Sequence, residues 1–157
     1  MNNKGFTLIE LIVVIILLSI VAATVVPKLL SSKGFEEYSY RDELIIKLRA
    51  IQLRTMQQIN SSTCQSIRVS STEIGLLKTA DNATTCTTDF AGESTTVVIN
   101  HPDVALSISE GLSSFSFSQL GKPLGCIIED PCLITLTLSG ESSLEIEINS
   151  EGYIHAI

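Results

Sequence analysis

Several residue types are scarce in this chain of 157 residues. It has no tryptophan, its aromatic residues make up only 5% of the sequence, and it contains 2 histidines. There is no nucleophile elbow, no phosphate-binding glycine loop and no pair of histidines at helical spacing. The core of any folded domain must therefore be mainly aliphatic. We expect no catalytic residue and no cofactor, and so no enzyme.

Basic residues are too few and too dispersed to form a nucleic-acid-binding surface. The chain has 10 Lys and Arg against 17 Asp and Glu, which gives a formal net charge of −7. Proteins that bind nucleic acid through its phosphates carry a clustered basic patch. We therefore expect no nucleic-acid partner. His101 precedes a proline and indicates a loop, whereas His155 lies in an ordinary strand pattern, so neither is predicted to be catalytic.

What the chain does contain is a long apolar stretch near its beginning. From Phe6 to Val26 every residue is apolar except Thr7, Glu10, Ser19 and Thr24. At 1.5 Å per helical residue this stretch is about as long as the hydrocarbon layer of a membrane is thick. A charged side chain in the middle of a membrane costs about 2.5–3.5 kcal/mol. The stretch predicts a membrane helix, and a simple anchor gives no reason for Glu10.

Two simpler interpretations of this stretch remain open. A secretory signal peptide has an apolar core of about 7–15 residues followed by a small-residue cleavage site. Here the apolar run is longer, and Ala22-Ala23-Thr24 is a poor cleavage signal. The other alternative is an uncleaved single-pass anchor that takes no part in assembly.

The run Lys4-Gly5-Phe6-Thr7-Leu8-Ile9-Glu10-Leu11 resembles the N-terminus of type IV pilins and of the pseudopilins of type II secretion. The resemblance implies that prepilin peptidase cuts between Gly5 and Phe6 and that Phe6 is then methylated. Glu10 becomes the fifth residue of the mature chain, where the family has its glutamate, and Pro27 lies where many members have a proline. The implied partners are other pilin subunits, prepilin peptidase and the inner-membrane assembly machinery. The implied location is the bacterial inner membrane, with a periplasmic head, and later the filament.

Elementary electrostatics supports a role for Glu10 in assembly. Cleavage leaves an α-amino group on Phe6, and such a group has a pKa of about 8, so it is mostly protonated at neutral pH. In a bundle of staggered helices, Glu10 of one subunit can meet the amine of its neighbour. A carboxylate that gains a partner only on assembly would set the register of the bundle.

The rest of the sequence predicts an α+β fold, in which a long N-terminal helix packs on a C-terminal antiparallel β-sheet head. We expect a leader at residues 1–5, a membrane and assembly half of the helix at 6–27, an amphipathic half at 28–60 and a head at 61–157. Pro27 predicts a kink or a loosened turn. Glu37–Arg41 and Glu43–Lys47 are spaced as ion pairs on a solvated helix face. The apolar stripe of the amphipathic half comprises Leu44, Leu48, Ile51 and Ile59, with Ile45 and Met56 near it.

Beyond residue 64 the hydrophobic period approaches two, which is typical of strands. The predicted strands are Ser66–Ser70, Thr96–Asn100, Ala105–Ser109, Ser114–Ser118, Leu133–Leu138, Leu144–Ile148 and Tyr153–Ala156. The fifth and sixth alternate cleanly and are joined across residues 139–142 as a hairpin. Residues 75–95 are rich in threonine and are expected to form a polar loop.

The C-terminal half has a second, looser resemblance. The segments Phe117–Pro123, Ile134–Leu138 and Ile146–Ile154 are similar to the end of H-type minor pilins and pseudopilins. Minor pilins of the mannose-sensitive haemagglutinin (MSHA) pilus are the most similar members. This implies a minor pilin of an MSHA-type pilus involved in pilus biogenesis and surface attachment. A type II secretion pseudopilin and a membrane-anchored binding module remain as alternatives.

An even number of cysteines in a periplasmic head indicates disulfides. With 4 cysteines three pairings are possible. We favour Cys64–Cys86, which tethers the loop after the helix, and Cys126–Cys132, which closes a tight turn. Zinc is the competing interpretation, but the spacing lacks the C-x-x-C pattern of zinc sites. The adjacent acids Glu129 and Asp130 supply too few ligands to predict calcium.

Overall fold

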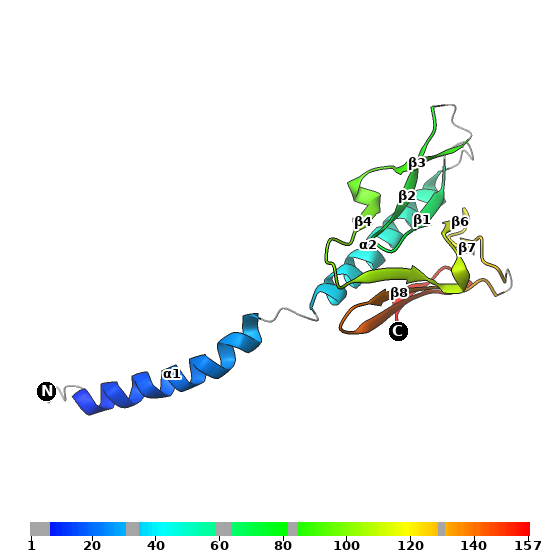
Figure 1. Cartoon of the computed structure of the whole chain (residues 1–157). Helices are drawn as coiled ribbons and strands as arrows, with labels where there is room; N and C mark the ends of the chain where they lie inside the picture. The colour runs from blue at the N-terminus through cyan, green and yellow to red at the C-terminus, as the bar shows by residue number, and fades with distance from the viewer. Residues whose placement is uncertain (1–6, 31–34, 59–63, 82–84, 129–130) are drawn as a thin grey trace, which may run out of the picture. The chain divides into compact units, whose positions relative to one another are not determined.

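The structure is a computed structural model that describes residues 7–30, 35–58, 64–81, 85–128 and 131–157, apart from the side chains of residues 26–30 and 110. The chain divides into two compact units, Met1–Lys33 and Gly34–Ile157, which we describe separately (Figure 1). We call the second unit the head.

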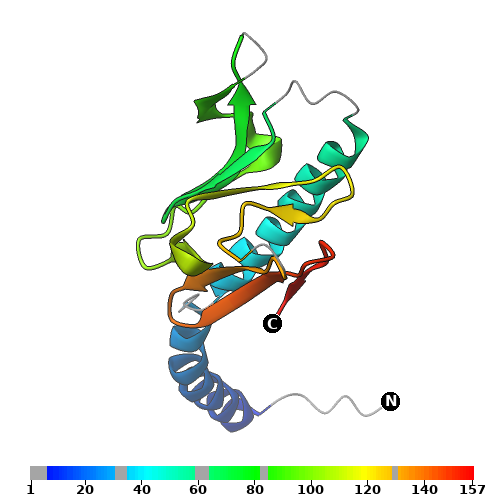
Figure 2. The ribbon, with the colours of Figure 1, turned by 90° about the vertical axis from the view of Figure 1, so that its right-hand side faces the viewer.

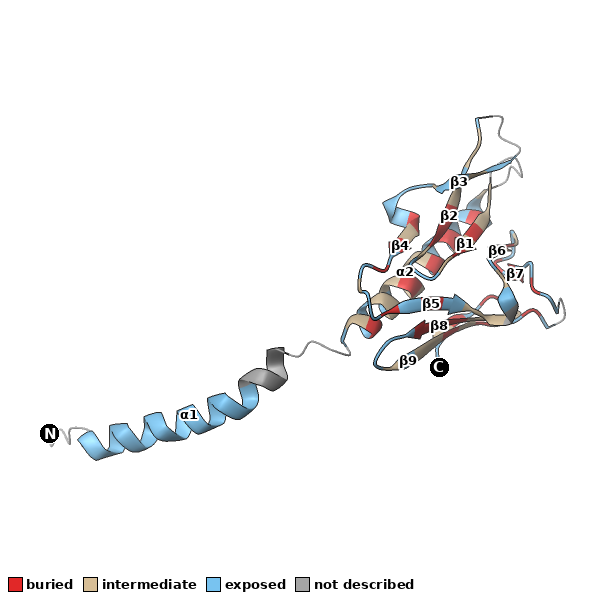
Figure 3. Ribbon diagram, viewed as in Figure 1, coloured by how far each residue is buried: buried red, intermediate tan, exposed pale blue. Residues whose placement is uncertain are grey.

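The first unit contains helix α1 (Leu8–Leu30), whose side chains are almost all aliphatic. The described side chains of α1 are exposed (Figure 3), and Leu8–Val25 has a mean hydropathy of 3.0. Within the described residues, α1 is the one helix long and apolar enough to cross a membrane, judged by length and composition. The helix continues through Pro27 to Leu30, so the proline does not end it. The kink expected at Pro27 stays a prediction.

The head begins with helix α2 (Phe35–Gln57). Its buried residues are Glu37, Leu44, Leu48, Ile51 and Thr55, and their spacing places them on one face of the helix. The predicted stripe is therefore confirmed for Leu44, Leu48 and Ile51. Met56 is exposed, and Ile59 lies outside the described residues.

A six-stranded antiparallel sheet forms one part of the head. It contains β1 (Ser66–Val69), β2 (Glu73–Thr79), β3 (Cys86–Phe90), β4 (Thr96–Val98), β6 (Ser114–Phe117) and β7 (Pro123–Leu124). The strands follow the order β3-β2-β1-β6-β7, and β4 pairs with β2. One edge of β2 is shared, because β4 pairs with its first residues and β3 with its last ones. A 3-10 turn, η1 (Glu93–Thr95), leads into β4.

A four-stranded antiparallel sheet forms the other part, in the order β10-β9-β8-β5. Its strands are β5 (Ala105–Ile108), β8 (Ile134–Ser139), β9 (Ser143–Ile148) and β10 (Ile154–Ala156), and a 3-10 turn, η2 (Ser109–Gly111), follows β5. Leu136 lies opposite Ile146, and Leu138 lies opposite Leu144. This register confirms the predicted hairpin, because the apolar side chains of β8 and β9 fall on the same face.

Helix α2 contacts strands of both sheets, namely β4 of the larger and β8, β9 and β10 of the smaller (Figure 2). The buried side chains are mostly leucine, isoleucine and valine, as the lack of tryptophan predicted. Phe115 and Phe117 add an edge-to-face pair with ring centroids 5.7 Å apart. The buried residues of the head, red in Figure 3, lie where α2 and the two sheets meet.

All of the strands predicted from the sequence are present, but the prediction of a loop over residues 75–95 is wrong. This segment contains most of β2, all of β3 and η1. Leu76 is buried, and a Cβ on Gly75 would come within 2.7 Å of Thr96 Oγ1, so the segment packs tightly. Threonine is a good strand former on a half-exposed surface, so its abundance in this segment is compatible with strands and does not indicate a loop. The short strand β7 was also missed.

Candidate functional site

Glu10 lies in the first turn of α1. Its backbone N–H donates to the carbonyl O of Thr7 at 3.1 Å and to Thr7 Oγ1 at 3.3 Å. Thr7 thus caps the helix, and the Thr-x-x-Glu spacing is that of a capping box, where the helix dipole favours a negative charge. Glu10 therefore has a local role at the start of the helix beside the predicted role in assembly. Gly5 and Phe6 lie outside the described residues.

The two hydroxyl side chains further along α1 are satisfied within the helix. Ser19 Oγ donates to the carbonyl O of Ile15 at 2.7 Å, and Thr24 Oγ1 donates to that of Val21 at 3.0 Å. Such bonds let hydroxyls enter an apolar medium without an unpaired donor. Among the described side chains of α1, residues 8–25, Glu10 carries the one charge, and a carboxylate in an apolar medium is costly unless it has a partner.

Glu37 is a second carboxylate of interest, and sequence reasoning placed it wrongly. It is only 2% exposed, and its Oε1 accepts hydrogen bonds from the backbone N–H groups of Glu141 at 2.6 Å and Ser142 at 3.4 Å. These two residues form the turn between β8 and β9. The expected ion pair with Arg41 is absent from the described contacts, since Arg41 pairs with Asp42 at 2.9 Å. Glu37 lies one heptad before the buried Leu44, and this spacing could have revealed that it faces the core.

The surroundings of Glu37 favour its charged form. Hydrogen bonding by its own backbone N–H, with smaller contributions from Ser142, Glu141 and the nearby His101, holds the pKa of Glu37 below its usual value, although burial acts in the opposite direction. A Cβ on Gly140 would collide with Glu37 Oε1, so the glycine leaves the space that the carboxylate occupies. Glu37 thus fastens the first turn of α2 to the β8–β9 turn.

Other polar side chains of α2 bind the backbone of η1, β4 and β10. Lys47 donates to the carbonyl O of Glu93 at 2.8 Å and to that of Thr96, and it forms the predicted ion pair with Glu43 at 2.8 Å. Arg49 donates to the carbonyl O of Ile154 at 2.8 Å. Through these contacts the helix is fastened to a strand of each sheet, β4 of the larger and β10 of the smaller.

Both cysteine pairs are bonded as the sequence analysis favoured. Cys64 is joined to Cys86 with a Cα–Cα distance of 5.1 Å, and Cys126 is joined to Cys132 with one of 5.5 Å. The first bond ties the segment before β1 to the start of β3, and the second closes the turn between β7 and β8. Since no free cysteine is present in the described chain, the competing zinc interpretation has no thiolate ligands.

We predict that replacing both Cys64 and Cys86 by serine destabilises the head by about 3 kcal/mol, because the bond closes a longer loop than Cys126–Cys132 does. The matched control, with serine at Cys126 and Cys132, should cost about 2 kcal/mol. Denaturant unfolding of the two variants measures both values. Equal stability of the wild type and the Cys64 and Cys86 variant would contradict the prediction.

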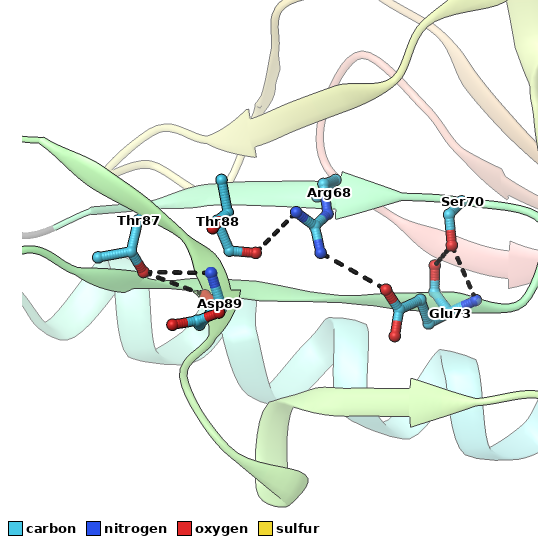
Figure 4. A network of polar contacts seen from close by, with 6 residues as sticks. All are labelled: Arg68, Ser70, Glu73, Thr87, Thr88 and Asp89. Carbon is cyan, nitrogen blue, oxygen red and sulfur yellow. Dashed lines mark hydrogen bonds and ion pairs between the residues drawn. The ribbon is translucent and has the colours of Figure 1, made fainter.

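A network of polar contacts covers the outer surface of the larger sheet (Figure 4). The guanidinium of Arg68 on β1 lies 4.6 Å from the ring centroid of Phe90, donates to the carbonyl O of Thr88 at 2.7 Å and pairs with Glu73 at 3.5 Å. Arg68 therefore links β1, β2 and β3. Because two of its guanidinium nitrogens bind groups within the sheet, the network contributes to the stability of the head.

The remaining candidate groups do not form a metal or catalytic centre in the part of the chain that the structure describes. No three His, Cys, Asp or Glu side chains gather there as metal ligands. His155 stacks on Tyr153 at a centroid distance of 4.9 Å, and its Nε2 lies 3.9 Å from Glu147 Oε1. His101 Nδ1 accepts a hydrogen bond from the backbone N–H of Asp103. Glu129 and Asp130 lie outside the described residues.

Comparison with known proteins agrees with these features. Residues 1–26 match the family model described as the prokaryotic N-terminal methylation motif. The type IV wide pilus major component PilA4 of Thermus thermophilus is 29% identical over 102 residues, which cover 64% of this chain and 75% of PilA4. Two crystal structures of the type IV minor pilin FimU of Pseudomonas aeruginosa share the fold, with TM-scores of 0.56 and 0.54 and identities of 13% and 12%. The aligned regions cover 78% and 76% of this chain and 88% and 91% of the FimU chains.

The chain therefore combines a match to the N-terminal methylation motif, an apolar first helix and a head whose fold is similar to that of FimU. Together, the motif, the relative and the shared fold support the type IV pilin family, with a head like that of a minor pilin. Type IV pilins assemble with other pilin subunits, and α1 fits membrane anchoring.

Proposed function

We propose that this chain is a minor pilin of an MSHA-type type IV pilus, involved in pilus biogenesis and surface attachment. Prepilin peptidase cuts it between Gly5 and Phe6, and Phe6 is methylated. The observation that carries the proposal is the methylation motif over residues 1–26, which continues into an apolar helix with the carboxylate Glu10 in its first turn. The MSHA-type assignment depends on the looser resemblance of the C-terminal half.

The proposal assigns a role to each part of the chain. Residues 1–5 are a cytoplasmic leader, and 6–27 cross the inner membrane and enter the helix bundle of the filament. Residues 28–60 are the amphipathic half of the N-terminal helical region, and 61–157 are the β-rich periplasmic part. The head lies in the periplasm, an oxidising compartment, and the two disulfides are consistent with this location. Its partners are other pilin subunits, prepilin peptidase and the assembly machinery. The pilus names of PilA4 and FimU favour a pilus over a type II secretion system.

Processing tests the proposal directly. Gly5 precedes the proposed cut, and a side chain there would crowd the close approach of the backbone to the peptidase. We expect Gly5→Val to leave a full-length precursor in the inner membrane, whereas the wild-type protein from sheared filaments begins at Phe6 and carries one added methyl group. Mass spectrometry of the two proteins makes the measurement.

As a control, Lys4→Ala changes the leader but retains the glycine, and it should still be cut. A Gly5→Val protein that begins at Phe6 would overturn the assignment of the peptidase. A wild-type protein that keeps residues 1–5 would favour the alternative of a membrane-anchored module.

A further inference from the structure

Exposed aromatic side chains gather at one place on the head, the start of α2. The chain has 5 phenylalanines and 3 tyrosines. Within the described residues the exposed ones are Phe35, Tyr38 and Tyr153, and Phe35 is 77% exposed. Phe35 and Tyr38 are three residues apart on the helix, so they lie side by side on its first turn. We call these two residues the aromatic patch.

The fold keeps charge away from the aromatic patch. Glu36 is half-buried, and Glu37 is turned into the head, where the β8–β9 turn binds its carboxylate. The guanidinium of Arg41 lies 5.2 Å from the ring centroid of Tyr38 and pairs with the exposed Asp42 at 2.9 Å. Along α2 the surface therefore presents two aromatic rings first and an ion pair about one turn later.

The aromatic patch follows closely on α1 in the sequence. The most apolar part of α1 ends at Val25, and the helix ends at Leu30, about 8 Å further along its axis. The headgroup layer on each side of a membrane is about 5–8 Å thick, so a membrane-spanning α1 would end in that layer. Four residues join the helices, and an extended chain spans at most about 3.6 Å per residue, which keeps Phe35 within about 18 Å of Leu30. The charged residues of this connection are Lys28 and Lys33, a residue type whose amine reaches towards the headgroups.

We propose that the aromatic patch docks in the headgroup layer of the membrane that α1 crosses. Aromatic rings favour this layer because their apolar body enters the lipid, and the hydroxyl of a tyrosine stays in contact with water. The covalent connection to α1 selects lipid as the occupant, since it holds the rings near the membrane before any other partner arrives.

The rings, and not charge, hold the head in this contact. The chain has a net charge of −7, and Glu141, which is exposed in the turn that binds Glu37, adds a negative charge near the start of α2. Anionic lipids therefore give no advantage over zwitterionic ones. The inference rests on the part of the proposed function in which α1 crosses a membrane. It does not depend on cleavage or on the kind of pilus.

Because the chain has no tryptophan, a single introduced tryptophan can report contact with lipid. Full-length Tyr38→Trp is reconstituted at low density in phosphatidylcholine vesicles, with or without bromine on the acyl chains close to the headgroups. Bromine quenches the fluorescence of a tryptophan that touches it. We expect bromine to remove about half of the emission, and Phe35→Asp in the same chain to reduce this loss about twofold, because a carboxylate is disfavoured in lipid.

Ile46→Trp is the matched control. Ile46 is also exposed, at 67%, and lies eight residues, or about 12 Å, further along α2. Its emission should be quenched by acrylamide in the water and not by bromine. Flotation of the vesicles checks that the chain is anchored, and circular dichroism checks that each variant is folded.

Each outcome of the experiment bears on the proposal. Equal, weak quenching of Tyr38→Trp and Ile46→Trp by bromine in an anchored chain would overturn it. Protection of Tyr38→Trp from acrylamide without quenching by bromine would also overturn it and assign the aromatic patch to a protein partner. A chain that does not float with the vesicles would overturn the anchoring by α1, and the inference with it, whereas a failure of cleavage at Gly5 would leave both unchanged.

Discussion

Glu10→Leu is expected to lower the amount of this subunit in sheared filaments by roughly a hundredfold, while membrane insertion and cleavage continue. In the proposed bundle the carboxylate neutralises the α-amino group of a neighbouring subunit. An uncompensated charge buried in an apolar bundle costs about 3–5 kcal/mol, which corresponds to at least a hundredfold change in an assembly equilibrium. Comparison of the membrane fraction with the sheared filament fraction measures the effect.

Two controls separate the assembly role of Glu10 from its position in a capping box. Glu10→Gln keeps a residue type that suits a capping box but removes the charge, so it should also fail to enter filaments. Ser19→Leu removes a polar group whose hydrogen bond lies within α1, and it should assemble normally. If Glu10→Gln assembled like the wild type, the side chain would act through the start of the helix, and its charge would not be needed for a neighbouring amine.

Glu37→Ala is expected to destabilise the head by about 3–5 kcal/mol, because two backbone N–H groups in the β8–β9 turn lose hydrogen bonds to a charged acceptor, each worth about 1.5–3 kcal/mol. For a domain of this size the melting temperature should fall by roughly 10–20 °C. Glu141→Gln provides the control, since it removes an exposed carboxylate from the same turn and should have little effect. An unchanged melting temperature of Glu37→Ala would contradict the interpretation.

The same carboxylate makes the stability of the head depend on pH in a defined direction. The pKa of Glu37 in the folded head is below its ordinary value of 4.5, so the folded state binds this proton less readily than the unfolded state does. Its contribution is therefore complete above about pH 4.5 and is lost as the pH falls towards the pKa of the folded state. The difference in melting temperature between the wild type and Glu37→Gln should shrink over this range. A constant difference would show that ionisation of Glu37 does not matter.

The sequence determined the features that depend on local composition and spacing. The apolar run predicted α1, and the leucines and isoleucine at helical spacing predicted the buried face of α2, because a helix repeats every 3.6 residues wherever it lies. Alternation in Ile134–Leu138 and Leu144–Ile148 predicted a strand pair, since a one-residue slip would expose its apolar side chains. The motif around Gly5 and Glu10 was recognisable because it is contiguous in the chain.

Only the tertiary structure decided which residues that are distant in sequence form hydrogen bonds with one another and which are buried together. Glu37 fitted an ion pair with Arg41 by spacing, but the turn at Glu141, more than a hundred residues away, supplies its hydrogen bonds. The threonines of β3 resembled a loop because β3 is an edge strand whose polar side chains face water. The burial of the neighbouring strand β2 cannot be recognised from a local sequence pattern. Gln52 joins two turns that are remote in sequence, because its Nε2 donates to the carbonyl O of Gly121 and to that of Gly152. Hydrogen bonds and burial depend on proximity in space, which a periodic pattern in one segment does not encode.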